Sequence, residues 1–512
     1  MTERPEESAG AGASEALHWR RLHPASVLVD FLRRLGKLAY FIVVALVVRL
    51  IGGGGGGPHW ADYVIGVIAV FGAVGAFFRY LVTRYAVQSD RLVIRTGLIT
   101  RQLRTIPLER IQNIELERGV AHRLLGVVDV NIETAGGSKA EGQLSALAVG
   151  DAERLKAELL ERRDGGPVGA AAVESAEVIW QASLGDLLLT GATGNRAGWI
   201  AAGLMSLLYL FAEEVGRLPG PLAGVVQRAL QGGSVTAVAL AVALAVAGLV
   251  LLLLAGWVVS ILWTIMLYFG FVLRRGDGRL RRKYGLFTQH ESVVPLRRVQ
   301  ILKLEAPLLR RLLGYTTVMA ETAGSVVDRE SGGAAPLCPL IRQAGAAELC
   351  REVFPDLDLA GVAWTPVSRL TIRRGFIRYA LIGLALMVVV AVAVNWWLAV
   401  LTPLVLGLAL LAACLRYRVL AFAEHGNYLL ARAGVLTRRV WIVPQGKVQW
   451  LSSTQSPFQR RLDLATLAIN TAGSKQLSGA EIVDLPAEAA HTLQDRLSRV
   501  ASAQGLWLAD GV

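Results

Sequence analysis

Basic side chains form the densest chemical feature of this 512-residue sequence. Between Val272 and Arg311, eleven Lys and Arg residues stand against three acidic residues, a net charge of +8 in forty residues. Such residues can bind anionic lipid headgroups, each contributing about 1 kcal/mol near a membrane surface, or an acidic partner. Part of the cluster has a simpler interpretation, since basic residues that follow an apolar run are retained in the cytoplasm. The candidate lipid- or partner-binding residues are Arg279, Arg281, Arg282, Lys283, Arg297, Arg298, Arg310 and Arg311.

Residues that could support catalysis or metal binding do not form a recognisable site. The seven histidines are scattered without a His-Glu-x-x-His spacing, and Cys338, Cys350 and Cys414 follow no zinc pattern. The glycine run at 52–57 lacks the Lys-Ser/Thr of a phosphate-binding loop, which favours a flexible connector. No Gly-x-Ser-x-Gly nucleophile motif occurs. We therefore predict that the protein is not an enzyme and uses no cofactor, metal or small-molecule substrate.

The composition places much of the chain in a bilayer. Hydrophobic residues make up 54% of the sequence and the mean hydropathy is +0.47, above the usual range of soluble proteins. A net charge of +13 would suggest nucleic acid in a soluble protein, but here Arg lies beside apolar runs. Anionic lipid explains that placement better, and no nucleic acid partner is expected.

Six apolar segments are candidate membrane spans, and they form three pairs. They cover residues 31–51, 61–82, 199–211, 235–273, 379–394 and 396–415. A crossing needs about 20 residues, so the third and fifth segments must recruit flanking residues. The fourth has 39 residues without a charge, about 58 Å as a helix against a hydrocarbon core of about 30 Å. Its end must therefore serve another element.

Basic flanks predict the orientation of the spans. Lys and Arg cluster before the first and fifth segments and after the second, fourth and sixth, whereas the first outer connector has none. The positive-inside rule then places the protein in the bacterial inner membrane, with both termini in the cytoplasm. Small residues such as Gly66, Gly72, Gly75 and Ala76 in the second span permit close helix approach, internally or with a partner.

One sequence block occurs three times without a gap, at 97–136, 285–324 and 434–473. Chance agreement at so many fixed positions is negligible, so the block indicates a triplicated domain. Each copy closes on Thr-Ala-Gly. The motif residues, copy by copy, are Pro107, Arg110, Gln112 and Arg123, then Pro295, Arg298, Gln300 and Arg311, then Pro444, Lys447, Gln449 and Arg460.

The pattern within each copy predicts short strands followed by a closing helix. Turn signals stand at 89–90, 276–278 and 425–427, so a strand should lead into each turn from the preceding span, which for the middle copy is 267–273. A short helical turn is predicted at 120–125, 308–313 and 458–462, and a closing helix at 151–162, 344–353 and 486–500. The Gln of the motif is expected to make a structural hydrogen bond to the next strand.

These blocks resemble the bacterial PH-like domain family. The resemblance rests on 106–112 and 294–300, each followed by Arg-Leu-Leu-Gly, and extends to YdbT-like members that alternate span pairs with such domains. It implies a PH-like β-barrel or sandwich with a closing C-terminal helix after each of three transmembrane pairs, and no catalytic motif. The third copy departs from it at 443–447 and 461–463, which puts any ligand shared with the other copies in doubt.

The predicted organisation follows from the spans and the repeat. It comprises a disordered cytoplasmic tail at 1–30, span pairs at 31–82, 196–266 and 373–416, PH-like domains at 83–163, 267–355 and 417–500, linkers at 164–195 and 356–372, and a tail at 501–512.

The expected function is that of a non-enzymatic membrane scaffold whose PH-like domains bind anionic lipid, a partner protein or both. The resemblance suggests envelope maintenance or protection as the process. Partners would be membrane lipid and another membrane protein or a homo-oligomer, for example a single-copy PH-like membrane protein. The alternative is a small six-span transporter or permease subunit with cytoplasmic regulatory domains, because polar backbone sites leave no mark in a sequence.

Overall fold

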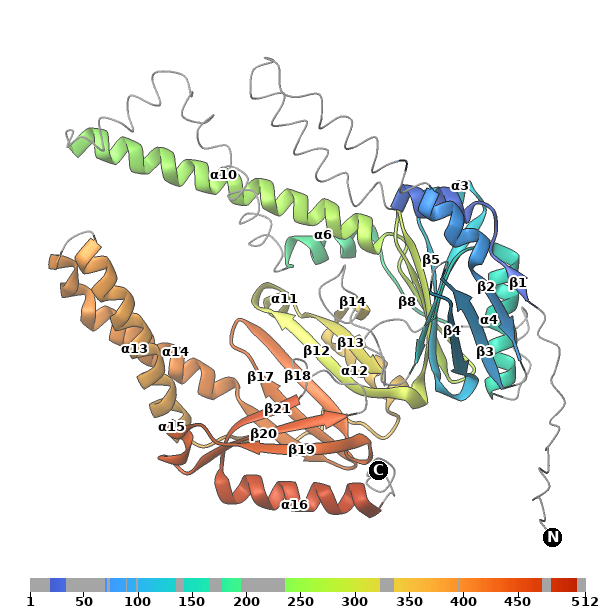
Figure 1. Ribbon diagram of the computed structural model, residues 1–512. Helices are drawn as coiled ribbons and strands as arrows, with labels where there is room; N and C mark the ends of the chain where they lie inside the picture. Colours follow the sequence, from blue (N-terminus) through green and yellow to red (C-terminus); the bar gives the residue numbers. More distant parts are fainter. Residues whose placement is uncertain are drawn as a thin grey trace, which may run out of the picture. The chain divides into compact units, whose positions relative to one another are not determined.

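The three-dimensional structure is a computed structural model that describes most of the chain (Figure 1). The described residues are 19–33, 70, 74–88, 90–97, 100–134, 142–164, 177–194, 235–322, 336–393, 396–471 and 480–503. They fall into two compact units, Met1–Ser175 with Thr288–His290, and Ala176–Phe287 with Glu291–Val512. The first unit holds the first copy of the repeat, and the second unit holds the other two.

The first copy is built from two antiparallel sheets and a closing helix. One sheet has the order β1-β2-β3-β4, and the other contains β5, β6 and β7 as neighbours. Its buried core includes Leu92, Ile94, Val130 and Leu155. The elements are β1 (Arg20–Arg21), β2 (Arg84–Val87), β3 (Arg91–Thr96), β4 (Gln102–Pro107), η1 (Leu108–Arg110), β5 (Ile111–Arg118), α3 (Val120–Leu124), β6 (Val127–Thr134), β7 (Gly142–Ala148) and α4 (Val149–Asp164).

The second copy repeats this order after a long apolar helix. Its elements are β8 (Glu177–Gln181), α6 (Leu184–Ala192), α10 (Val235–Tyr268), β9 (Val272–Gly276), β10 (Arg279–Tyr284), β11 (Gln289–Pro295), η2 (Leu296–Arg298), β12 (Val299–Pro307), α11 (Leu308–Leu312), β13 (Tyr315–Thr322), β14 (Pro336–Arg342) and α12 (Gln343–Val353). The predicted short helical turns and closing helices are thus present in both copies.

The third copy follows two apolar helices. Its elements are β15 (Thr365–Pro366), α13 (Leu370–Ala393), η3 (Trp396–Leu401), α14 (Thr402–Val419), β16 (Ala421–His425), β17 (Tyr428–Ala433), β18 (Thr437–Pro444), η4 (Gln445–Lys447), β19 (Val448–Thr454), α15 (Pro457–Arg460), β20 (Leu464–Thr471), β21 (Ala480–Pro486) and α16 (Ala487–Ala503). The last sheet has the order β19-β20-β21.

The repeated Pro-to-Gln motif forms a corner between the two sheets of each copy. The proline ends β4, β11 and β18, a 3₁₀ turn follows, and the next strand begins. The strand register slips at Gln112, Gln300 and Gln449, each skipped between its two paired neighbours. Such a bulge bends a strand and increases its twist, so the motif serves the fold. Gln300 Nε2 donates to the carbonyl of Arg298 at 3.4 Å rather than to another strand.

Three described helices are long and apolar enough to cross a membrane: Val246–Tyr268, Leu370–Val392 and Trp396–Val419. They correspond to the fourth, fifth and sixth predicted spans. The predicted spans at 31–51 and 199–211, and most of 61–82, lie outside the described residues, although 26–33 and 74–82 are helical.

The predicted strand start at Leu267 is wrong. Helix α10 continues to Tyr268, and β9 begins at Val272. The turn that follows the helix contains Gly270, whose φ of +63° is a left-handed conformation that glycine adopts readily. Tyr268 packs in the domain core, with its ring centroid 6.2 Å from that of Phe271 and 5.9 Å from that of Tyr284. The last helical turn is therefore held by tertiary contacts.

A short strand leads into each span pair, which corrects the predicted tail and linkers. Residues 19–30 are ordered as β1 and a helical turn, and the predicted linkers contain β8, α6 and β15. The leading strands pair antiparallel with the strand that follows the second helix, as β1 with β2, β8 with β9 and β15 with β16. In each copy, the segment that contains the predicted span pair is thus flanked by two adjacent strands.

The second and third copies share one sheet, with the order β14-β13-β12-β18-β17-β16-β15. Strand β12 pairs with β18 from Leu302↔Ile442 to Pro307↔Thr437. Tyr428, from the third copy, belongs to the buried core of the second, and Ile301, from the second, belongs to the core of the third. The two copies therefore fold as one body.

Candidate functional site

A buried polar position recurs in the short helix of every copy. His122, Arg310 and Gln459 are equivalent by the constant offsets of the repeat, and they are only 8%, 7% and 3% exposed. Each contacts the residue seven positions further along. His122 Nε2 lies 3.1 Å from Asp129 Oδ1, Arg310 donates to the hydroxyl of Thr317, and Gln459 Nε2 donates to Thr466 Oγ1 at 2.8 Å.

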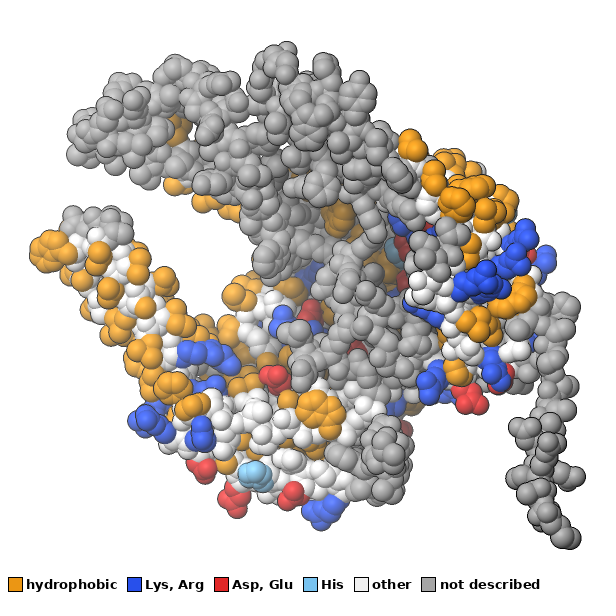
Figure 2. All heavy atoms as spheres, in the orientation of Figure 1, with side chains coloured by type: hydrophobic (Ala, Val, Ile, Leu, Met, Phe, Trp, Pro, Cys, Tyr) orange, Lys and Arg blue, Asp and Glu red, His pale blue; other side chains and the backbone are white. Residues whose placement is uncertain are grey.

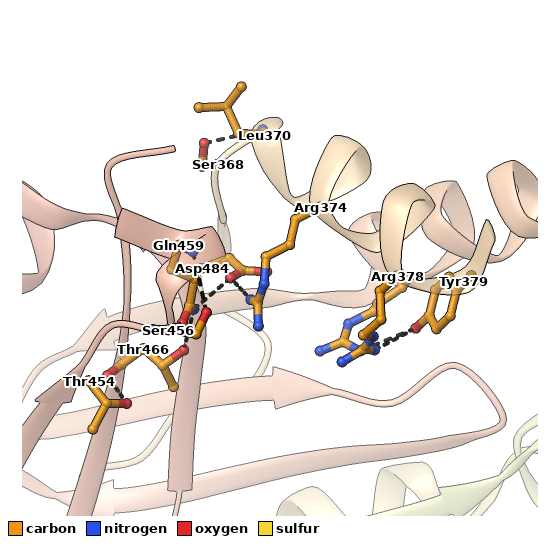
Figure 3. Close-up of polar contacts among 11 residues, drawn as sticks. Ser368, Leu370, Arg374, Arg378, Tyr379, Thr454, Ser456, Gln459, Thr466 and Asp484 are labelled. Atoms are coloured by element: carbon orange, nitrogen blue, oxygen red, sulfur yellow. Dashed lines mark hydrogen bonds and ion pairs between the residues drawn. The ribbon is translucent and has the colours of Figure 1, made fainter. Parts of the chain in front are cut away.

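In the third copy this position fastens a membrane helix to the domain (Figure 3). Gln459 Nε2 donates to Asp484 Oδ1 at 2.9 Å, and Arg374 of α13 donates to the same oxygen. Asp484 is 2% exposed and lies at a bulge of β21 opposite Thr466, with φ of +62°. A capping box orders α15, since Ser456 Oγ accepts from the amide of Gln459 and the Gln459 side chain accepts from the amide of Ser456.

The first copy has a similar buried contact, but its carboxylate, Asp129, lies on β6, whereas Asp484 of the third copy lies on β21. Asp129 accepts a hydrogen bond from Arg33, which lies in the helical residues 26–33, and another from the amide of Ala146 at 2.8 Å. Ala146 is the bulge residue here, with φ of +52°. Burial opposes ionisation of Asp129, but the hydrogen bond from His122 and the charge of Arg33 outweigh it and lower the pKa of this carboxyl.

The second copy differs in charge, because the residue at the buried helix position is itself the cation. Arg310 is the cation, and it donates to Thr193 Oγ1 and to the carbonyl of Thr190, both at 2.9 Å, and to the carbonyl of Pro339 at 3.2 Å. Thr190 and Thr193 stand at the carboxyl end of α6, where a helix has negative partial charge. The prediction that Arg310 binds lipid or a partner is therefore wrong, because its guanidinium is consumed by internal hydrogen bonds in a buried site.

Several other predicted basic residues also make internal contacts. Arg282 Nε donates to Ser292 Oγ at 2.5 Å, and Arg311 Nη1 donates to the carbonyl of Val435 at 3.3 Å. Lys447 Nζ donates to the carbonyls of Arg297 and Val299, at 2.9 and 2.6 Å, and burial lowers its pKa. Arg311 and Lys447 thus help to join the second copy to the third.

The remaining predicted residues are distributed over the surface rather than gathered at one site. Lys283 and Arg297 are exposed, as are Arg110, Arg123 and Arg460. Arg279, Arg281 and Arg298 are half-buried on β10 and η2. Pro107 is exposed and Pro295 is buried, and both prolines, with Pro444, serve the corner described above.

A cavity of about 790 Å³ lies beside the anchor of the third copy, between the first turns of α13 and the short helix α15. Arg373, Arg378 and Arg461 line it and are exposed, and none of them has a carboxylate partner among the described residues. Arg374 also lines it, but Asp484 offsets its charge. The apolar part of the lining comes from Ile377, Leu381, Ile382, Phe458 and Leu462.

This cavity stands where the apolar surface of the α13–α14 hairpin gives way to charged side chains. Figure 2 shows apolar groups along the hairpin and Lys or Arg side chains at its base. Arg416 and Arg418 lie in the last turn of α14. Such a boundary is where the lipid headgroups of a membrane meet a protein.

Comparison with known proteins identifies the repeated domain. The family model described as Bacterial PH domain matches residues 34–163, 224–354 and 367–501. The chain belongs to the bacterial PH domain family. The three predicted PH-like copies are thus confirmed as three bacterial PH domains. The chain is also similar to the UPF0699 transmembrane protein YdbT of Bacillus subtilis (strain 168), with 23% identity over 486 residues, 92% of this chain and 96% of that protein. No solved structure matches the chain.

The anchors of the three PH domains were not predicted from the sequence. The residue type differs in each domain, so an identity search finds the shared Arg123, Arg311 and Arg460 and overlooks the buried position just before them. A signal was present in the constant offsets, because polar residues occupy the equivalent positions 122, 310 and 459. The cavity arginines of α13 were interpreted as topological flanks, which does not predict that Arg461 joins them.

Proposed function

We propose that this protein is a non-enzymatic inner-membrane scaffold that holds three PH domains against the cytoplasmic leaflet, and that the third PH domain binds anionic phospholipid in the cavity beside α13. One observation carries the proposal: Arg373, Arg378 and Arg461 converge on a half-apolar cavity at the base of a membrane hairpin. Envelope maintenance or protection is the process that we propose for the scaffold.

The lining suits a phospholipid better than a soluble anion. Guanidinium groups bind phosphate oxygens through paired hydrogen bonds, and Arg373, Arg378 and Arg461, which have no carboxylate partner among the described residues, supply them. Leu381 and Ile382 continue from the cavity along the exposed side of α13, where an acyl chain would lie in the membrane. A free phosphate would leave that apolar surface without a role.

Exposed apolar side chains on the short helices support a position at the leaflet surface. Leu309 and Leu312 of α11 are 54% and 73% exposed, Leu124 at the end of α3 is 82% exposed, and Phe458 of α15 is 58% exposed. Apolar residues next to basic ones are typical of segments that lie in the membrane interface. The basic ends of α13 and α14 favour the cytoplasmic side.

No specific observation favours transport. Among the described spans, Val246–Tyr268 has no charged residue, and the other two carry their charges near one end. Ion-coupled transporters usually place ionisable groups within the membrane. A scaffold therefore accounts better for the described helices.

The experiment measures phospholipids retained by the full-length protein in nanodiscs that contain phosphatidylglycerol and phosphatidylcholine. The test variant combines Arg373→Gln, Arg378→Gln and Arg461→Gln. If each arginine contributes about 1 kcal/mol, the preference for the anionic lipid should fall by on the order of 100-fold, with less effect at high salt. Native mass spectrometry counts the lipids that remain bound.

A matched triple variant, Arg110→Gln with Arg123→Gln and Lys283→Gln, removes the same charge from exposed positions outside the cavity. It should retain the anionic lipid. An equal loss in both triple variants would attribute the binding to net charge and would contradict the proposed site.

A further inference from the structure

Strand β19 of the third PH domain has an unpaired edge among the described residues. The equivalent edge in the second PH domain, that of β12, is paired with a strand of the next domain. In the second domain, β12 pairs on one side with β13 and on the other with β18 of the next domain. The equivalent strand β19 pairs with β20, and it stands last in its sheet among the described residues. A place that is occupied in one copy is thus open in the next.

Burial changes at this edge in the way that a missing neighbour predicts. Ile301 on β12 is 0% exposed, because it lies in the core of the following domain. The equivalent residue on β19 is Trp450, which is 41% exposed. The strand Val448–Thr454 contains no Lys, Arg or Pro. Edge strands that must stay single usually carry such residues as protection against pairing, and this one does not.

The opposite end of the chain presents the complementary strand. β4 is equivalent to β18 and stands last in the order β1-β2-β3-β4. Its residues from Gln102 to Thr105 are exposed, and Leu103 is 64% exposed. In β18 the corresponding stretch is largely covered by β12 and the cores around it.

We propose that β19 of one chain pairs antiparallel with β4 of a second copy of this chain, in the register that β12 and β18 use. Transferring that register by the repeat offsets places Leu451 opposite Thr105, Ser453 opposite Leu103, and Thr454 opposite Gln102. Main-chain hydrogen bonds between strand edges supply the affinity, and Trp450 is covered by the incoming domain as Ile301 is.

Charge is compatible with this register. In the second domain Glu305 of β12 binds Arg439 of β18 at 3.0 Å. The equivalent pair, Thr454 and Gln102, is uncharged. Arg104 would face Ser452, so no two like charges stand opposite each other. The contact joins two different surfaces, so it is head-to-tail and extends the row of PH domains from one chain to the next.

The test uses two differently tagged full-length chains expressed together, one with Leu103→Cys and the other with Ser453→Cys, both with Cys414→Ser. The buried Cys338 and Cys350 stay, because burial raises the pKa of the Cys350 thiol to about 12 and that of Cys338 as well. Opposed strand positions lie within disulfide reach, so mild oxidation of native membranes should give a linked species that carries both tags.

Two controls decide the outcome. Pairing Leu103→Cys with Ser452→Cys shifts the register by one residue and turns the thiol to the other face, so its yield should be at least several-fold lower. Trp450→Lys in the Ser453→Cys chain should reduce the linked species, whereas Leu436→Lys, at a residue 73% exposed, should not. Equal yield in both registers, no product with both tags, or linkage to a different PH domain protein alone would overturn the proposal.

Discussion

Arg374 of α13 and Asp484 of β21 meet 110 positions apart in the sequence, and their contact fixes a membrane helix to the third PH domain. The carboxylate is buried and also accepts from Gln459, so the pair belongs to the domain interior. In the first domain Asp129 likewise binds Arg33, which lies in the helical residues 26–33. Each pair therefore ties a helix to the interior of its PH domain.

Removing one member of the Arg374–Asp484 pair should destabilise the third domain strongly. Arg374→Met leaves a buried carboxylate without its cation, and such losses cost about 3 kcal/mol or more. The double variant Arg374→Met with Asp484→Asn should recover part of that stability. Thermal unfolding in detergent measures both, and a purely additive double variant would show that the two residues do not interact.

Acid should weaken the contact between Asp129 of the first domain and Arg33 of the helical residues 26–33. The pKa of Asp129 is lowered in the folded protein from its ordinary value of 3.8. Its stabilising contribution is therefore present above about pH 4 and disappears as the pH falls through the lower folded-state pKa. Hydrogen exchange of β6 between pH 3 and 6 should show this loss. Asp129→Asn should be less stable at pH 6 and should lose the dependence, whereas Asp151→Asn should keep it.

Close packing of the α13–α14 hairpin should depend on Gly383. A Cβ added there would lie 2.6 Å from Cγ1 of Val405, so Gly383→Leu must push the helices apart. Gly407→Leu is the matched control, because a Cβ at Gly407 meets no atom within 4 Å. The first variant should unfold at lower temperature and expose the hairpin to protease, and equal behaviour of the two variants would contradict the expected packing.

Membrane topology is open to a labelling test. Cysteines at residues 55, 220 and 395 should react with an impermeant thiol reagent added outside the cell, because the basic flanks place these connectors in the periplasm. Cysteines at 138, 331 and 478, within the three domains, should react only after the membrane is opened. Outside labelling at any of these last three positions would contradict the cytoplasmic placement of the PH domains.

The triplication, the short helices, the closing helices and the apolar spans follow from the sequence alone. Constant offsets and apolar runs are properties of the amino-acid sequence, so they can be recognised without knowing which strands pair. The leading strands β1 and β15 were missed because two residues, Arg20–Arg21 or Thr365–Pro366, are too few to show a period. The end of α10 was misplaced because contacts of Tyr268 with the domain core decide it.

Only the tertiary structure decided which polar residues are buried and which strand edges are filled. Charge in a sequence does not reveal burial: Arg310 counts among the basic residues of the middle domain, yet carbonyls and hydroxyls from α6 and β14 enclose it. The cavity arginines come from α13 and from the end of α15, which are adjacent only after the bulge of β21 and the anchor at Asp484 bring them together. Pairing of β12 with β18 likewise depends on edges that exist only in the folded domains, because a backbone hydrogen bond carries no side-chain signal in the sequence.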